Sequence, residues 1–191
     1  MTGIAPGFAG FYGKLPARGD FVRAGLPGDT VDALDAWARA TLAASRIALG
    51  EAWTACWMEA PVWRFALAPG IAGASGLGGV WLPSMDRVGR CFPLIVAAEA
   101  ASAGTAWLDA AEDLGFQAVT ADLTPETLAA RLAAIPSAPI RPALGEMPRS
   151  GGVWWTSGAP RRRATRIETA SLPDPAGFAG FLADETALHA S

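Results

Sequence analysis

Apolar residues recur every three to four positions in several stretches of the chain, which is the spacing of one face of an α-helix. The clearest stripe consists of Val31, Leu34, Ala38, Leu42 and Leu49. Asp29 is the predicted N-cap of this helix, and Gly50 is its predicted end. Further helices are expected over residues 51–58 and 105–119, from Thr124 with Pro125 in the first turn, and from Asp174.

Other stretches alternate between apolar and polar residues, which is the pattern of a half-buried strand. In residues 62–68, Trp63, Phe65 and Leu67 share one face and Arg64 lies on the other. Residues 94–98 are continuously apolar and suit a central strand covered on both faces. Further strands are expected over residues 7–14, after the turn in residues 15–20, and over 79–82, with a hairpin formed by 153–156 and 164–168.

The interleaving of these strands and helices predicts an α/β protein. The chain has 191 residues, which lies within the roughly 100 to 200 residues of one domain, so a single domain is expected over residues 1–191. Four prolines divide residues from about 136 to 150 into a long connector.

Composition and charge narrow the class of protein. Apolar residues make up 51% of the chain and charged residues 17%, which favours a large core and opposes disorder. The net charge of −3 supplies no general attraction to nucleic acid or anionic lipid, so neither is expected as a partner. Residues 65–85 carry no charge, but seven Gly and Pro residues interrupt them, so no membrane insertion is expected.

The N-terminal residues and the cysteines indicate the compartment. The first thirteen residues have neither a basic region nor a continuous apolar region of the kind found in secretion signals. The two cysteines, Cys56 and Cys91, stand beside aromatic residues and are expected to be buried, reduced thiols. We therefore expect a cytoplasmic protein.

Few residues could support catalysis. The single histidine, His189, lies near the end of the chain, so neither a serine–histidine triad nor a site with several histidines is expected. Residues 7–14 fail as a phosphate loop because Phe8 replaces a required Gly and Leu15 follows Lys14. Acidic pairs such as Asp109 and Glu112, and the basic run at 161–163, are interpreted as solvated surface. No catalytic residue, metal or cofactor is expected.

A cluster of charges interrupts an otherwise uncharged region at residues 83–94. Asp86, Arg87 and Arg90 stand between two apolar runs, where two buried strands must reach the surface. Ser84 precedes them and is suited to capping a bend. In an earlier turn, Arg18 and Asp20 are expected to form a surface ion pair.

Several short motifs follow one another along nearly the whole chain. They are Gly13-Lys14-Leu15-Pro16, Arg18-Gly19-Asp20-Phe21, Ala60-Pro61-Val62-Trp63-Arg64-Phe65, Pro83-Ser84, Asp86-Arg87-Val88-Gly89-Arg90, Phe92-Pro93-Leu94, Trp154-Trp155 and Leu172-Pro173. In this order they resemble the TagF (ImpM) proteins of type VI secretion systems. The chain departs from the family at Met85, Cys91 and Ser171, which concerns packing more than function.

The resemblance implies a cytoplasmic regulator that represses type VI secretion after translation and without catalysis. The implied partner is the forkhead-associated scaffold protein of the system, and no small-molecule ligand is expected. The resemblance also implies a three-layer α/β/α sandwich around a mixed, largely antiparallel sheet. Some relatives are fused to a serine/threonine phosphatase domain, which we expect to be a separate protein here.

Two interpretations of the charged residues remain open. In the docking hypothesis a partner protein binds one surface formed by Lys14, Arg18, Asp20, Ser84, Asp86, Arg87 and Arg90. In the bracing interpretation Asp86 and Arg90 form an ion pair that locks the connection between two strands. The alternative functions are an enzyme that acts on a small anion held by Arg87 and Arg90, and a structural subunit of the secretion apparatus.

Overall fold

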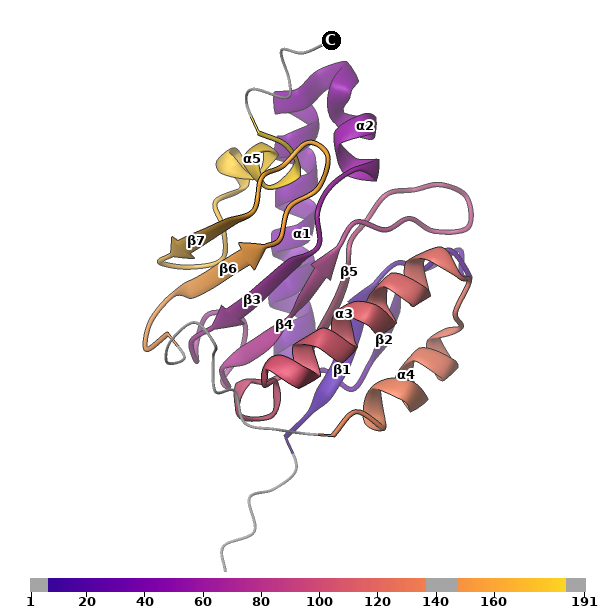
Figure 1. The fold of residues 1–191 in the computed structure, drawn as a ribbon, viewed down its shortest axis with the longest axis vertical. Coiled ribbons are helices and arrows are strands. Elements are labelled where there is room, and N and C mark those ends of the chain that lie inside the picture. Colours follow the sequence, from indigo (N-terminus) through magenta and orange to yellow (C-terminus); the bar gives the residue numbers. More distant parts are fainter. Residues whose placement is uncertain (1–6, 137–147, 185–191) are drawn as a thin grey trace, which may run out of the picture.

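The computed structural model describes residues 7–136 and 148–184, and Figure 1 shows their arrangement. Seven strands form one continuous sheet in the order β2-β1-β5-β4-β3-β6-β7. The strands are β1 (Ala9–Gly13), β2 (Val22–Ala24), β3 (Trp63–Leu67), β4 (Leu77–Leu82), β5 (Leu94–Glu99), β6 (Gly152–Thr156) and β7 (Thr165–Thr169). Together with the helices they make an α/β protein, as predicted.

Every pair of neighbouring strands in this sheet is antiparallel. The prediction of a mixed sheet is therefore wrong. A parallel pair needs a crossover connection between neighbours, commonly a helix. Here the long helical connections join β2 to β3 and β5 to β6, which are not neighbours in the sheet. No parallel pair is formed among the described strands.

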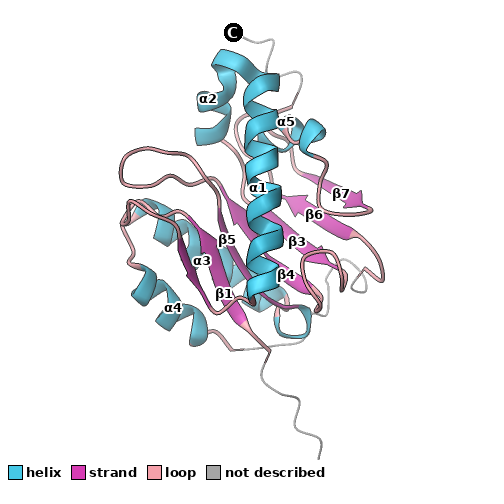
Figure 2. Cartoon of the chain, turned by 180° about the vertical axis from the view of Figure 1, so that it is seen from behind, coloured by secondary structure: helices cyan, strands magenta, loops and turns pink. Residues whose placement is uncertain are grey.

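Helices lie against both faces of the sheet (Figures 1 and 2). The elements on one face are α1 (Gly28–Leu49), α2 (Trp53–Met58) and α5 (Ala179–Leu182), and those on the other are α3 (Thr105–Thr120) and α4 (Pro125–Ala133). Short 3-10 turns at Gly50–Ala52, Ala100–Ser102 and Pro175–Gly177 precede α2, α3 and α5. Within the described ranges, no helix combines the length and hydrophobicity that crossing a bilayer requires.

The helix ends follow the sequence signals with one exception. Thr124 caps α4 as predicted, because its side chain accepts the N–H of Thr127. The N-cap of α1 is Pro27, so the prediction of Asp29 as the cap is wrong. Asp29 lies in the first turn of the helix instead, where its negative charge complements the helix dipole. Gly50 ends α1 as predicted, with a positive φ of 51°.

Alternation along the strands divides the core into two clusters. Trp63, Phe65 and Leu67 of β3 all face α1, as their spacing predicts. Trp81 of β4 joins that cluster, whereas its sequence neighbours Val80 and Leu82 face α3. Residues of β5 contribute to both clusters, which confirms the prediction of a strand covered on both faces.

Arg64 leaves β3 on the α3 face and binds two carboxylates of that helix. Its Nε lies 2.5 Å from Oε2 of Glu112, and its Nη1 lies 2.7 Å from Oδ1 of Asp109. These carboxylates were expected to face solvent alone. They instead attach α3 to the sheet, because the buried strand places a guanidinium beneath them.

The predicted hairpin is formed by β6 and β7, with Trp154 opposite Ile167. The basic run between these strands is more than a solvated turn. Arg161 Nε donates to Glu59 Oε2 at 2.7 Å, and Arg162 forms an ion pair with Asp184. These contacts attach the hairpin to the α1 side of the molecule. Most of the predicted proline-rich connector lies outside the described residues.

Candidate functional site

The connection between β4 and β5 holds the charge cluster in a tight turn. The N–H of Asp86 donates to the carbonyl of Arg90 at 3.1 Å, and the N–H of Gly89 donates to the carbonyl of Asp86 at 2.9 Å. Gly89 has a φ of 82°, a conformation that side chains with a Cβ rarely adopt. Met85 and Cys91 form a bridge just outside this turn. The chain therefore reverses within five residues.

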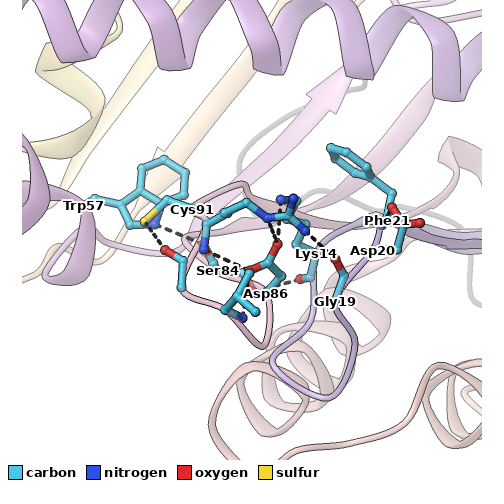
Figure 3. A network of polar contacts seen from close by, with 11 residues as sticks. Lys14, Gly19, Asp20, Phe21, Trp57, Ser84, Asp86 and Cys91 are labelled. Carbon is cyan, nitrogen blue, oxygen red and sulfur yellow. Dashed lines mark hydrogen bonds and ion pairs between the residues drawn. The ribbon is translucent and has the colours of Figure 1, made fainter.

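The carboxylate of Asp86 lies at the centre of the turn and accepts four hydrogen bonds. Oδ2 accepts from Lys14 Nζ at 2.8 Å and from Arg90 Nε at 2.6 Å. Oδ1 accepts the backbone N–H groups of Val88 and Arg90, at 3.1 and 2.9 Å. Figure 3 shows this network, in which the Asp86 side chain is 0% exposed. Such burial of a charge requires partners of this kind.

The environment of Asp86 keeps it ionised. Burial by itself would raise the pKa of this carboxyl, because the protein interior solvates a charge poorly. The hydrogen bonds from Lys14 and from the backbone and side chain of Arg90 outweigh burial and hold the pKa of Asp86 well below its usual range. A carboxylate that stays charged at neutral pH is not poised to act as a general acid.

The same turn is fastened to the loop that follows β1. The bonds to carbonyls of that loop are Ser84 Oγ to Lys14 at 2.8 Å, Arg87 N–H to Arg18 at 3.0 Å, Arg87 Nη2 to Ala17 at 2.6 Å and Arg90 Nη2 to Gly19 at 2.5 Å. We call the two loops, residues 14–21 and 83–93, the brace. It joins segments that are about 70 residues apart in the chain, as Figure 3 shows for Lys14, Gly19 and Asp86.

The predicted site residues meet in the brace, with one pairing corrected. The ion pair of the bracing interpretation, between Asp86 and Arg90, is present at 2.6 Å. Arg18 contributes its carbonyl, but its side chain pairs with Glu126 of α4 at 3.2 Å. The predicted ion pair between Arg18 and Asp20 is therefore wrong, since Asp20 accepts the N–H of Phe21 instead.

Two aromatic rings of the brace pack against each other and against cations on the α1 side. Phe21 and Phe92 meet edge to face, with ring centroids 4.8 Å apart. Lys14 Nζ and the Arg39 guanidinium lie 5.0 and 5.1 Å from the centroid of the Phe21 ring, within the range of cation–π attraction. No local sequence pattern indicates this role of Arg39, because α1 brings it to the loop from elsewhere in the chain.

An apolar groove of about 680 Å³ lies beside the brace. It is lined by side chains from α2, from α3, from the turn and from the segment between α2 and β3. They include Trp57, Met58, Val62, Met85, Phe116 and Val119. Met58 and Phe116 are 56% and 57% exposed, and Val88 in the turn is 70% exposed. Met58 and Phe116 were not among the predicted site residues. Neither residue is charged, so the charge pattern does not single them out. Phe116 also lies off the buried stripe of α3.

Metal ligands and reactive thiols are the remaining chemistry to consider at the site. The part of the chain that the structure describes holds no group of three or more His, Cys, Asp and Glu side chains placed to bind a metal ion. Both cysteines are free thiols, and Cys56 is buried as predicted. The prediction of a buried thiol is wrong for Cys91, which is half-buried. Burial raises the pKa of both thiols, which disfavours the reactive thiolate. His189 lies outside the described residues.

Comparison with known proteins identifies the family. Residues 10–135 match the TagF N-terminal domain, which is described as type VI secretion system-associated. This chain belongs to the TagF family. The match confirms the resemblance carried by the motifs, and it spans both loops of the brace. The residues that line the groove lie within it as well.

The similarity to a solved structure extends beyond the matched domain. The crystal structure of PA0076 from Pseudomonas aeruginosa PAO1, at 2.05 Å resolution, is 32% identical to this chain and superposes with a TM-score of 0.82. The alignment covers 93% of this chain and 94% of that one, so the β6–β7 hairpin region belongs to the shared fold. A comparison with curated protein sequences gave no match.

Proposed function

We propose that this chain is a non-enzymatic cytoplasmic regulator that represses type VI secretion after translation by binding the forkhead-associated scaffold protein of the system. Membership of the TagF family ties the chain to type VI secretion. The observation that carries a binding role is the exposed apolar groove beside the brace. Large apolar side chains exposed around a recess are a mark of protein interaction sites.

The groove has the construction of a binding site on a rigid frame. Trp57 forms part of its lining and is only 1% exposed, while Met58 and Phe116 offer anchors for a partner. Trp57 Nε1 donates to the carbonyl of Ser84 at 3.1 Å, so the lining and the brace are joined directly. In our proposal the helices on the two faces of the sheet complete a three-layer α/β/α sandwich that holds this unit in place.

The charged residues have a supporting role in this proposal. Lys14, Arg18, Asp20, Ser84, Asp86, Arg87 and Arg90 donate or accept within the chain, so their partners are already provided. Ser84, Asp86 and Arg87 also line the groove, and in our proposal the scaffold protein contacts its apolar part. Apolar anchors surrounded by a polar rim are the usual arrangement of a specific interface.

Binding of the purified scaffold protein, measured by isothermal titration calorimetry, tests the proposal. Met58→Asp and Phe116→Asp should each weaken binding by about tenfold or more, because each places a charge in an apolar contact. The matched control is Ile47→Asp, since Ile47 is 86% exposed on α1 and does not line the groove. Unchanged affinity in both groove variants, or equal loss in the control, would contradict the groove as the binding site.

A secretion assay tests repression separately from binding. Overproduction of the unaltered chain should reduce release of a type VI substrate, and the two groove variants at equal protein level should not. Cell fractionation tests the alternative of a structural subunit, which would sediment with assembled apparatus. We expect the chain to stay in the supernatant.

A thermal-shift screen tests the alternative of an anion-binding enzyme. Arg87 and Arg90 already donate to Ala17 and Gly19, so we expect phosphate and nucleotides to leave the melting temperature unchanged. A ligand that binds only the native state must raise the melting temperature. A rise that is lost in Arg87→Ala would favour the anion-binding alternative.

A further inference from the structure

Among the residues that the structure describes, the strand β7 forms an open edge of the sheet. It stands last in the strand order, and its ladder within the described residues is with β6 alone. Figures 1 and 2 both place it at the outer side of the molecule. An edge strand of this kind is a template for a further strand, because alternate backbone groups point away from its neighbour.

The opposite edge of the sheet differs. It is formed by β2, which has only three residues, and α4 packs against it. Short length and helical cover are the common ways in which proteins protect a sheet edge from pairing. β7 has five residues and lies at the outer side of the sheet, away from α3 and α4.

The sequence of β7 is complementary to itself when it is reversed. The strand is Thr165-Arg166-Ile167-Glu168-Thr169, with Ile at the centre, opposite charges beside it and Thr at both ends. In an antiparallel pair of two copies centred on Ile167, Arg166 of each copy lies opposite Glu168 of the other. Opposite charges in directly facing positions stabilise such a pair, and like charges destabilise it.

Among registers that differ by up to two residues, this one gives the most favourable charge pairing. A shift by one residue places each charge opposite an uncharged residue and moves it to the other face. A shift by two residues brings Arg166 opposite Arg166, or Glu168 opposite Glu168. The complementary register forms two ion pairs that the neighbouring registers lack, and we expect it to be the more stable for that reason.

The faces of the strand also suit this pairing. Ile167 lies opposite Trp154 and packs against the core on the α1 side. Arg166 and Glu168 lie on the other face, are exposed, and approach each other to 3.1 Å. In a pair of copies, an apolar contact between the two Ile167 side chains would therefore continue the core, and the ion pairs would form on the opposite, wet face.

We propose that β7 pairs with β7 of a second copy of this chain in antiparallel orientation, which gives a two-fold symmetric dimer with one sheet running through both copies. The interface is isologous, as in most homodimers, because each copy contributes the same strand. Because the ladder has only five residues, we expect a weak dimer whose population rises with protein concentration.

Sedimentation velocity over a concentration series tests the dimer and its interface together. Glu168→Arg and Arg166→Glu should each raise the dimer dissociation constant about tenfold or more, since two attractions become two repulsions. The double exchange Arg166→Glu with Glu168→Arg should restore dimerisation. Asp113→Arg, a charge reversal at an exposed position of α3, is the matched control and should have no effect.

Cysteine cross-linking tests the register independently of affinity. In a Cys91→Ser background, Ile167→Cys should give a covalent dimer on mild oxidation, because residue 167 faces its own copy. Thr165→Cys should not, because residue 165 faces residue 169. The proposal is overturned if the chain stays monomeric up to about 1 mM, if the charge reversals leave a dimer unchanged, or if both cysteines cross-link equally.

Discussion

The brace and the groove share the turn between β4 and β5, but their side chains differ. Those of the brace are hydrogen-bonded within the chain, and several of those in the groove are exposed to solvent. In the brace, a buried carboxylate accepts four hydrogen bonds from the chain itself. In the groove, Met58 and Phe116 remain more than half exposed. The charged motif that is conspicuous in the sequence is thus hydrogen-bonded within the chain, and uncharged side chains beside it remain exposed.

Removal of Asp86 should have the largest effect on stability. Asp86→Ala leaves Lys14, which is 6% exposed, without its carboxylate, and two backbone N–H groups lose their acceptor. Removing one partner of a buried ion pair costs about 3 to 5 kcal/mol. We expect the free energy of unfolding to fall by about this amount in urea denaturation followed by tryptophan fluorescence.

Asp20→Ala is the control for that measurement. Asp20 is an exposed carboxylate in the same brace and accepts a local bond from Phe21. Its removal should change the free energy of unfolding by no more than about 0.5 kcal/mol. If both variants lose the same free energy of unfolding, the buried hydrogen bonds of Asp86 do not stabilise the fold. The charged residues of the brace would then have no special role in stability.

Acid should weaken the brace before it affects the groove. The pKa of Asp86 is lower in the folded chain than its value of about 3.9 in an unfolded one, so the unfolded state binds the proton more readily. The stabilisation from Asp86 is therefore complete above about pH 5 and is lost as the pH falls through 4 and below. Urea midpoints measured from pH 6 to pH 2.5 should show a steeper fall for the unaltered chain than for Asp86→Asn. Parallel curves would mean that other carboxylates, such as Asp184, account for the acid sensitivity.

Arg90→Ala should have a smaller effect and separates bracing from docking. The side chain of Arg90 is 62% exposed, and Asp86 keeps its bonds from Lys14 and the backbone when the guanidinium is lost. We expect a loss of about 1 kcal/mol in stability, with nearly unchanged affinity for the scaffold protein. Lost affinity at full stability would show that the charged cluster itself contacts the partner.

The groove variants should have the smallest effect on stability. Met58→Asp and Phe116→Asp alter side chains that are already exposed, so each should change the free energy of unfolding by no more than about 0.5 kcal/mol. Ile47→Asp should behave in the same way. Thermal unfolding of the three variants provides the check, and a large loss at Met58 or Phe116 would place that residue in the core.

The helices and strands were predictable where a local pattern repeats. The stripe of α3, the alternation of β3 and the cap at Thr124 each depend on residues that are close together in the sequence. The hairpin of β6 and β7 followed from two short runs with a turn between them. In each case the apolar side of the element is set by its own sequence.

The errors arose where a distant segment supplied a stronger partner. Arg18 was assigned to nearby Asp20, but α4 presents Glu126 from more than a hundred residues away. Arg162 was placed in a solvated turn, and Asp184 pairs with it after α5. The mixed sheet was wrong because strand direction depends on which strands become neighbours, which local patterns do not encode.

The sequence alone determined the family, the element types and the faces that the strands and helices bury, because these follow from motif order and from short-range periodicity. It also marked Asp86, Arg87 and Arg90 as a connected group. Only the tertiary structure decided that their partners are Lys14 and the carbonyls of residues 17–19, and that Met58 and Phe116 border a groove beside them. Those relations depend on packing between segments far apart in the chain, and such packing determines which polar groups are used internally and which apolar side chains remain exposed.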